Sequence, residues 1–278
     1  MRAVRGQRGL AVLSGFALLA LLPRRAEATW SIAVLDRAHQ QIGVAGASCT
    51  ADVYGIMSVH PGQGVLIAQA IGDNAAIQRA NQLLASGASP DSVLRVITAP
   101  TLDSTSSFRQ YAIATFAGGL AQFTGDSIAP YHGERQADDI VVQGNSLAGP
   151  AVLDSAMSAI KLARGAGRPL YDVLMAGLAA GGAAGGDVRC GVQRATSAFL
   201  VVARPGERPF LPYLTLAVFG VERGTVNAVE LLGGRLARWE ASGSPFNVLT
   251  NEGVQPPPRA VPADYPPAIG PKRRRGDL

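Results

Sequence analysis

The sequence contains few of the residues on which several protein classes depend. It has two cysteines and three histidines in 278 residues, and His39, His60 and His132 are too scattered to form a metal-ligand motif. Charged residues make up 16% of the chain, against about a quarter in an average soluble protein. Abundant aliphatic residues exclude a wholly disordered chain, and the 33 glycines follow no three-residue period, which excludes collagen. No metal or cofactor is predicted.

The positive charge lies at the two ends of the chain. The formal net charge is +5, of which residues 1–28 contribute +4 and residues 252–278 contribute +2, so that residues 29–251 carry −1. A nucleic-acid-binding face is therefore not predicted. Residues 252–278 contain two proline runs followed by a basic cluster from Lys272 to Arg275. This composition predicts an extended, disordered tail.

Residues 1–28 have the pattern of a secretory signal peptide. Three arginines precede a 13-residue apolar stretch from Leu10 to Leu22, and Ala26-Glu27-Ala28 matches an A-x-A cleavage site. An apolar helix of this length spans about 20 Å, whereas the hydrocarbon core of a bilayer is ~30 Å thick. We therefore expect cleavage and export to the periplasm or the medium, with no stable membrane anchor afterwards. A retained membrane anchor is the less favoured alternative.

Export gives the two cysteines, Cys49 and Cys190, an oxidising environment in which they can pair. Closing a loop of about 140 residues would stabilise the fold by roughly 4–5 kcal/mol in the chain-entropy model. Two alternatives remain open at this point. The cysteines are then either two unrelated buried thiols, or one of them is a catalytic residue or a metal ligand.

Strand-like and helix-like apolar patterns follow one another in blocks, without an internal repeat. Such blocks favour antiparallel sheets covered by helices over a parallel βαβ array. Residues 29–245 are therefore predicted to form one layered α+β domain. Strands are predicted at 29–36, 42–48, 55–59, 64–70, 110–116, 120–124, 140–143, 196–203 and 214–219. Helices are predicted at 73–85, from Ser89 to Pro100, from Pro150, at 170–180 and from Asn227.

Cleavage after Ala28 makes Thr29 the first residue of the mature chain. Such a threonine combines a hydroxyl nucleophile with a free α-amine, whose reference pKa is about 7.7–8.0. A usable fraction of the amine is then neutral at pH 7 and accepts the hydroxyl proton, so no separate histidine is required. The alternative is that a small polar residue follows the cleavage site by chance.

Five short segments connect the chain to a known family. They are Thr29-Trp30-Ser31-Ile32, Gly43 to Ser48, Phe123-Thr124-Gly125, Gln143 to Pro150 and Ala184 to Arg189, in this order. Together they resemble the DUF1028 family, whose fold is similar to that of the N-terminal nucleophile (Ntn) hydrolases. The resemblance implies a four-layer αββα sandwich, with two antiparallel sheets between helical layers. It supplies no substrate. Family members usually begin Met-Thr, whereas here 28 residues precede Thr29.

Four further residues are candidates for the same site. The side-chain amide of Asn145 is suited to stabilising an oxyanion, and Ser48 is expected near the α-amine. Arg189 is suited to holding a substrate carboxylate, and Asp187 to orienting the terminal ammonium or a substrate amine. The alternatives are a turn asparagine, an ordinary strand-end serine, and an Asp187–Arg189 pair that acts as a structural clamp.

These observations predict an exported hydrolase that cleaves a small amide or peptide-like bond through Thr29, without a cofactor. Its partner is a small-molecule substrate, and a homo-oligomer is left open. A non-catalytic protein that binds a small zwitterion on the same scaffold is the alternative. A hydrolase based on Cys49 is a third hypothesis, which a disulfide to Cys190 would remove.

Overall fold

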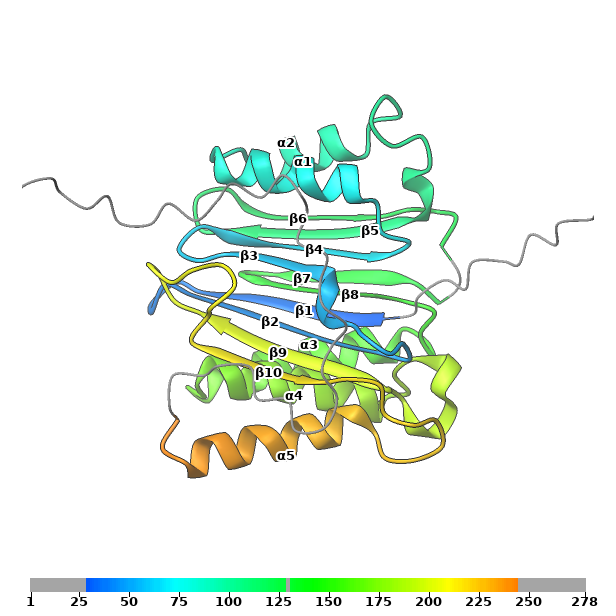
Figure 1. The fold of residues 1–278 in the computed structure, drawn as a ribbon, viewed down its shortest axis with the longest axis vertical. Helices are drawn as coiled ribbons and strands as arrows, with labels where there is room; N and C mark the ends of the chain where they lie inside the picture. The colour runs from blue at the N-terminus through cyan, green and yellow to red at the C-terminus, as the bar shows by residue number, and fades with distance from the viewer. Residues whose placement is uncertain (1–28, 129–130, 245–278) are drawn as a thin grey trace, which may run out of the picture.

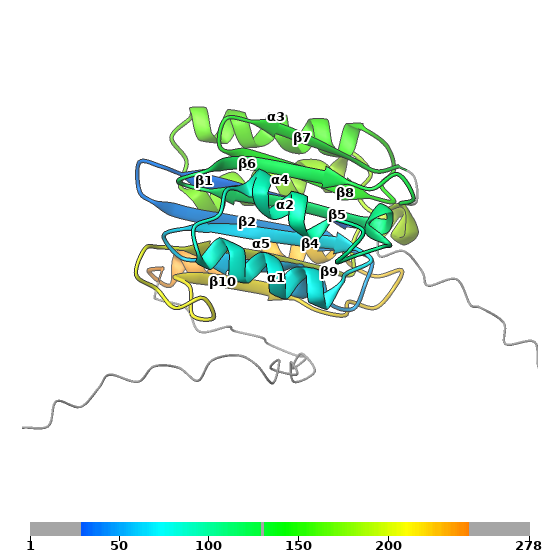
Figure 2. The ribbon, with the colours of Figure 1, turned by 90° about the horizontal axis from the view of Figure 1, so that it is seen from above.

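The computed structural model describes residues 29–128 and 131–244, and within these ranges two antiparallel sheets lie face to face between layers of helices (Figures 1 and 2). The α+β class and the αββα sandwich predicted from the sequence are therefore confirmed. The predicted signal peptide, 1–28, and the predicted tail, 252–278, lie outside the described residues. None of the helices in the described ranges is long and apolar enough to span a membrane.

The larger sheet has six antiparallel strands, in the order β10-β9-β2-β1-β8-β7. β1 is an interior strand and pairs along its length with β2, because a short turn joins the two. β8 pairs with the other side of β1, so that strands distant in sequence become neighbours. The strand bounds are β1 (Thr29–Asp36), β2 (Gln41–Ser48), β7 (Gly133–Ala137), β8 (Ile140–Asn145), β9 (Ser197–Ala203) and β10 (Leu214–Val218).

The smaller sheet has four antiparallel strands in chain order, β3-β4-β5-β6. Short hairpins join β3 to β4 and β5 to β6, and the second of these turns at Gly118 and Gly119. β4 and β5 are neighbours although two helices lie between them in the chain. Gly119 has a φ of +80°, a conformation that glycine adopts without strain. The bounds are β3 (Met57–His60), β4 (Gly64–Ala70), β5 (Arg109–Thr115) and β6 (Gly119–Thr124).

Helices cover the outer face of each sheet (Figure 1). Two helices, α1 (Asn74–Ala85) and α2 (Pro90–Ile97), pack on the smaller sheet. Three helices pack on the larger one: α3 (Ala151–Gly165), α4 (Leu170–Ala183) and α5 (Ala228–Ala241). The predicted helix starts at Ser89 and Asn227 are confirmed, because the side chains of these residues accept hydrogen bonds from the first turns of α2 and α5 as N-caps.

The two-residue period of β1 determines which of its side chains face the other sheet. Trp30, Ile32 and Val34 pack against the helices α3 and α4, whereas Ala33 and Leu35 lie in the core between the sheets. Thr29 and Ser31 share the latter face. The first residue of β1 is therefore directed between the two sheets, at one end of the sandwich.

α4 lies close against β1 because its facing residues are glycines. A methyl group added at Gly177 would be 2.8 Å from Ile32 Cδ1, and one added at Gly181 would be 2.9 Å from Trp30 Nε1. Carbon atoms in ordinary packing are about 3.5–4.0 Å apart. The two glycines therefore allow the helix to support the strand that begins with Thr29.

Candidate functional site

The sheet register brings three of the predicted site residues together. Thr29 on β1 lies opposite Ser48 on β2 and opposite Asn145 on β8. All three residues are buried. Directly opposed residues on one face of an antiparallel pair have Cβ atoms about 4.5–5.5 Å apart. Ser197 on β9 extends the row, because it lies opposite Ser48. A polar row thus crosses four strands at the end of the sandwich.

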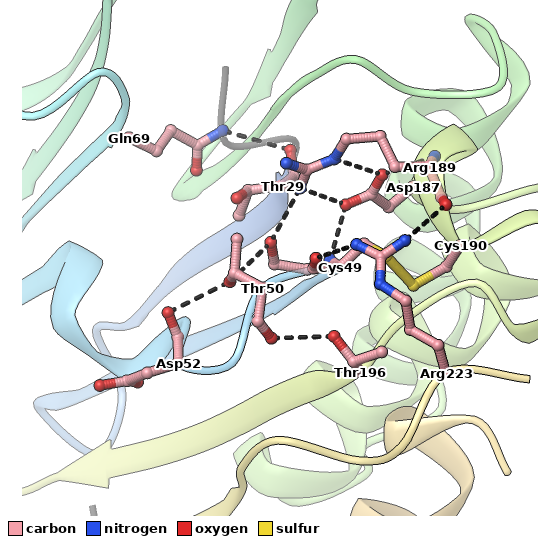
Figure 3. Close-up of polar contacts among 11 residues, drawn as sticks. Thr29, Cys49, Thr50, Asp52, Gln69, Asp187, Arg189, Cys190, Thr196 and Arg223 are labelled. Carbon is pink, nitrogen blue, oxygen red and sulfur yellow. Dashed lines mark hydrogen bonds and ion pairs between the residues drawn. A yellow bond between two sulfur atoms is a disulfide. The ribbon is translucent and has the colours of Figure 1, made fainter. Parts of the chain in front are cut away.

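The smaller sheet contributes two buried glutamines that face this row. Gln69 Nε2 donates to the main-chain oxygen of Thr29, 3.4 Å away, and Gln69 Oε1 accepts from Ser31 Oγ at 2.6 Å. Gln69 Nε2 also lies 2.7 Å from Gln110 Oε1. The bonds to Thr29 and Ser31 connect the first residues of β1 to the opposite sheet and fix where the strand begins. Figure 3 shows the bond from Gln69 to Thr29. Neither glutamine was predicted as a site residue from the sequence.

Gln110 determines the orientation of the Asn145 amide. Its Nε2 lies 3.1 Å from each of the carbonyl oxygens of Gly133 and Gly144. Because carbonyl oxygens only accept, the nitrogen of Gln110 must face them, and its oxygen therefore faces Asn145. Asn145 donates to that oxygen through Nδ2, at 3.3 Å. One hydrogen of Nδ2 remains for another acceptor, and Oδ1 has no hydrogen-bond partner among the described residues.

Asp187 is fully buried, and its carboxylate is already occupied. It accepts the main-chain N–H of Cys49 at 2.6 Å and that of Arg189 at 3.0 Å. The guanidinium of Arg189 adds two further bonds, from Nε at 3.1 Å and from Nη2 at 2.7 Å. The two residues therefore pair with each other, which is one of the two arrangements predicted from the sequence. Arg189 Nη2 also lies 3.5 Å from Ser48 Oγ, so the pair contacts the residue opposite Thr29.

A disulfide between Cys49 and Cys190 joins the end of β2 to the segment that contains this pair. The two Cα atoms are 5.6 Å apart, within the usual range for a bridge. The disulfide predicted from export is therefore present, and neither cysteine is free to act as a nucleophile or a metal ligand. The guanidinium of Arg223 adds two bonds across the same junction. It donates to the main-chain oxygens of Cys49, at 3.4 Å, and of Arg189, at 3.3 Å (Figure 3).

A buried ion pair stabilises the neighbouring end of β5. Arg109, which precedes Gln110, donates from Nε to Asp103 at 2.8 Å. Burial alone raises the pKa of Asp103, but hydrogen bonds from Arg109 and Thr105 outweigh it and hold that pKa below its usual value. The ion pair thus secures the strand from which Gln110 reaches the site.

His60 lies away from this site. His60 ends β3, and its Nε2 lies 3.0 Å from Asn81 Oδ1. The register pairs His60 with Gly64, at the other end of β4 from Gln69. Over the part of the chain that the structure describes, no group of three or more His, Cys, Asp or Glu side chains is arranged to hold a metal ion.

The fold and the site define an αββα sandwich protein in which an interior strand begins with a threonine between two polar neighbours. The chain belongs to DUF1028, a family of unknown function, whose model matches residues 29–223. The match begins at the first residue of β1.

Solved structures include a relative from the same family. A DUF1028 protein from Silicibacter pomeroyi is 23% identical and has a TM-score of 0.64, over 76% of this chain and 89% of its own. It confirms the fold. Anbu (ancestral beta-subunit) from Yersinia bercovieri is 12% identical with a TM-score of 0.39, over 82% of this chain and all of its own. An Anbu mutant from Hyphomicrobium has a TM-score of 0.32; similarity at this level supports no statement about this chain. No curated protein sequence matches it.

Proposed function

We propose that the protein is an exported hydrolase of the Ntn type, which cleaves a small amide or peptide-like bond with Thr29 as its nucleophile. The observation that carries the proposal is the position of Thr29, at the head of an interior strand and in register between Ser48 and Asn145. The signal-peptide pattern in residues 1–28 supports removal of the segment that precedes Thr29.

In the first half of the reaction, Thr29 Oγ attacks the carbonyl carbon of the substrate. The α-amine of Thr29 takes the hydroxyl proton as a new C–O bond forms, and the carbonyl oxygen becomes an oxyanion. When the C–N bond breaks, the α-ammonium returns the proton to the leaving amine. The acyl group then remains on Thr29 as an ester.

The two neighbours of Thr29 take different parts in this step. The free hydrogen of Asn145 Nδ2 is directed at the oxyanion, and Gln110 holds the amide in the required orientation. A well-placed donor of this kind contributes about 3–4 kcal/mol to transition-state stabilisation. The hydroxyl of Ser48 hydrogen-bonds to the α-amine. The Asp187–Arg189 pair positions Ser48 from the other side.

In the second half, water replaces the leaving amine. The water oxygen attacks the ester carbonyl carbon while the α-amine accepts a proton from the water. The proton then passes to Thr29 Oγ as the bond between Oγ and the acyl carbon breaks. The products are a carboxylic acid and the free enzyme. Because the same amine acts as base in both halves, the rate should rise with pH as the amine loses its proton.

The proposal is tested by assaying Thr29→Ala and Thr29→Ser on a panel of small amides, with the proteins recovered after export. We expect Thr29→Ala to abolish hydrolysis and Thr29→Ser to retain part of it, since serine keeps both the hydroxyl and the amine. Thr101→Ala, at an exposed turn residue, is the control and should behave as the wild type. Unchanged hydrolysis in Thr29→Ala would refute the proposal. Binding of an amide without product in both the wild type and Thr29→Ala would indicate the non-catalytic alternative.

A further inference from the structure

We infer that the substrate carries a carboxylate group, and that Arg223 at the edge of the site binds it. The inference rests on the proposed function, because it concerns the part of the substrate that lies beyond the bond attacked by Thr29. It assigns to Arg223 the role that the sequence alone suggested for Arg189.

Arg189 is poorly placed for that role because its charge is already balanced. Its Nε and Nη2 atoms both bond to Asp187, at 3.1 and 2.7 Å. These two atoms form the edge with which an arginine binds a carboxylate through two parallel hydrogen bonds. A substrate carboxylate would therefore have to displace Asp187, whose carboxylate would then be left buried without its counter-charge.

Arg223 differs from Arg189 in the groups that its guanidinium contacts. Its two bonds go to the main-chain oxygens of Cys49 and Arg189, which are neutral acceptors. A guanidinium has five N–H donors, so three are left over: Nε–H and one hydrogen on each of the two Nη atoms. Within the residues that the structure describes, Arg223 forms no ion pair. It is also exposed to solvent.

The two main-chain bonds also place Arg223 at the end of β2 and restrict its movement. Cys49 directly follows Ser48, which lies opposite Thr29 in the sheet. The disulfide between Cys49 and Cys190 holds both acceptor carbonyls in place (Figure 3). A side chain that is already ordered loses less conformational entropy when it binds a ligand. Arg223 is therefore a prearranged positive group bonded to the residue that follows Ser48.

A carboxylate fits both these donors and the proposed reaction. Small peptide-like amides such as N-acyl amino acids place a carboxylate close to the amide bond. Their carboxamide analogues have nearly the same size and shape but no charge. The difference in binding between each acid and its carboxamide therefore reports on the charge alone.

The test measures binding by calorimetry to the exported protein carrying Thr29→Ala, so that turnover does not consume the ligand. The probes are N-acetyl amino acids of several side-chain types and their C-terminal carboxamides. We expect the best-bound acid to bind roughly 10- to 100-fold more tightly than its carboxamide, as for a charge-assisted bidentate pair. Arg223→Gln should remove the difference, and Arg223→Lys should keep part of it. Arg95→Gln, at an exposed position of α2, is the charge-matched control and should leave the difference unchanged.

Three results would overturn the inference: acids that bind no better than carboxamides across the panel, a preference that survives Arg223→Gln, or inorganic phosphate that binds as tightly as the best acid. The last result would indicate a general anion site. None of these results depends on hydrolysis, which is measured separately with the wild type. A protein that prefers acids through Arg223 but shows no Thr29-dependent turnover would refute the proposed reaction and leave this binding site standing.

Discussion

Replacing Cys49 and Cys190 with serine is expected to lower stability substantially, because the disulfide closes a long loop. The two residues are 141 positions apart in the sequence. The chain-entropy model then gives a stabilisation of about 5 kcal/mol at 25 °C. Most single domains are stable by only about 5–15 kcal/mol. The bridge therefore accounts for a large part of what keeps this domain folded.

The assay is urea unfolding of the wild type and of Cys49→Ser/Cys190→Ser, with and without a reducing agent. For a domain of about 210 residues, this loss of unfolding free energy corresponds in thermal unfolding to a fall in Tm of about 10 °C. Reduction should bring the wild type to the stability of the double variant and leave the variant unchanged. A difference below about 1 kcal/mol would refute the reasoning, since it would mean that the bridge does not restrict the unfolded chain.

Three further predictions concern the interior. Gln110→Leu should lower the free energy of unfolding in urea by about 2–5 kcal/mol, because it leaves several buried polar groups unpaired. Gln122→Leu removes a single bond and should lower the free energy of unfolding by less. Equal decreases in the two variants would contradict this prediction. Asp103→Asn should cost about 3–5 kcal/mol at pH 7. Because the pKa of Asp103 is lowered in the fold, the difference in unfolding free energy between the variant and the wild type should close as the pH falls through that pKa. A difference that stays constant from pH 7 to pH 3 would contradict this prediction. Gly181→Ala should lower Tm through its contact with Trp30, whereas Gly233→Ala in α5, where the methyl group has room, should not.

Most of the fold could be predicted from the sequence, because most of its elements follow apolar periodicity. The strand β7 was missed. Its residues, Gly133–Ala137, are largely polar and only partly buried, and they form an edge strand that pairs with β8 alone. Nothing in so short a polar segment distinguishes a strand from a loop, because its order comes from the hydrogen bonds to β8.

The site could be predicted only in part. Thr29, Ser48 and Asn145 were chosen from a cleavage pattern and a family resemblance, and the sheet register is what makes them neighbours. Gln69 was missed because it lies in an otherwise apolar strand, and Gln110 because it stands at the start of β5 beside another polar residue, Arg109. A polar residue at an inward position of a predicted strand is a signal, but its partners become known only when two sheets are packed together.

The choice between roles for Asp187 and Arg189 had a similar limit. Two residues two positions apart, one acidic and one basic, can bind a substrate or each other. That they bond to each other depends on the complete burial of Asp187, which comes from the packing of the segment against β2 and the disulfide. Nothing in the sequence distinguishes Arg223 from other arginines, because no motif surrounds it.

The mass of the N-terminal peptide of the exported protein tests the central claim most directly. The catalytic proposal requires a free α-amine on the residue that also carries the nucleophilic hydroxyl. We expect this peptide to begin at Thr29 in the protein recovered after export. A chain that begins at any other residue, or that retains the leader, has no such amine at Thr29 and would contradict the account.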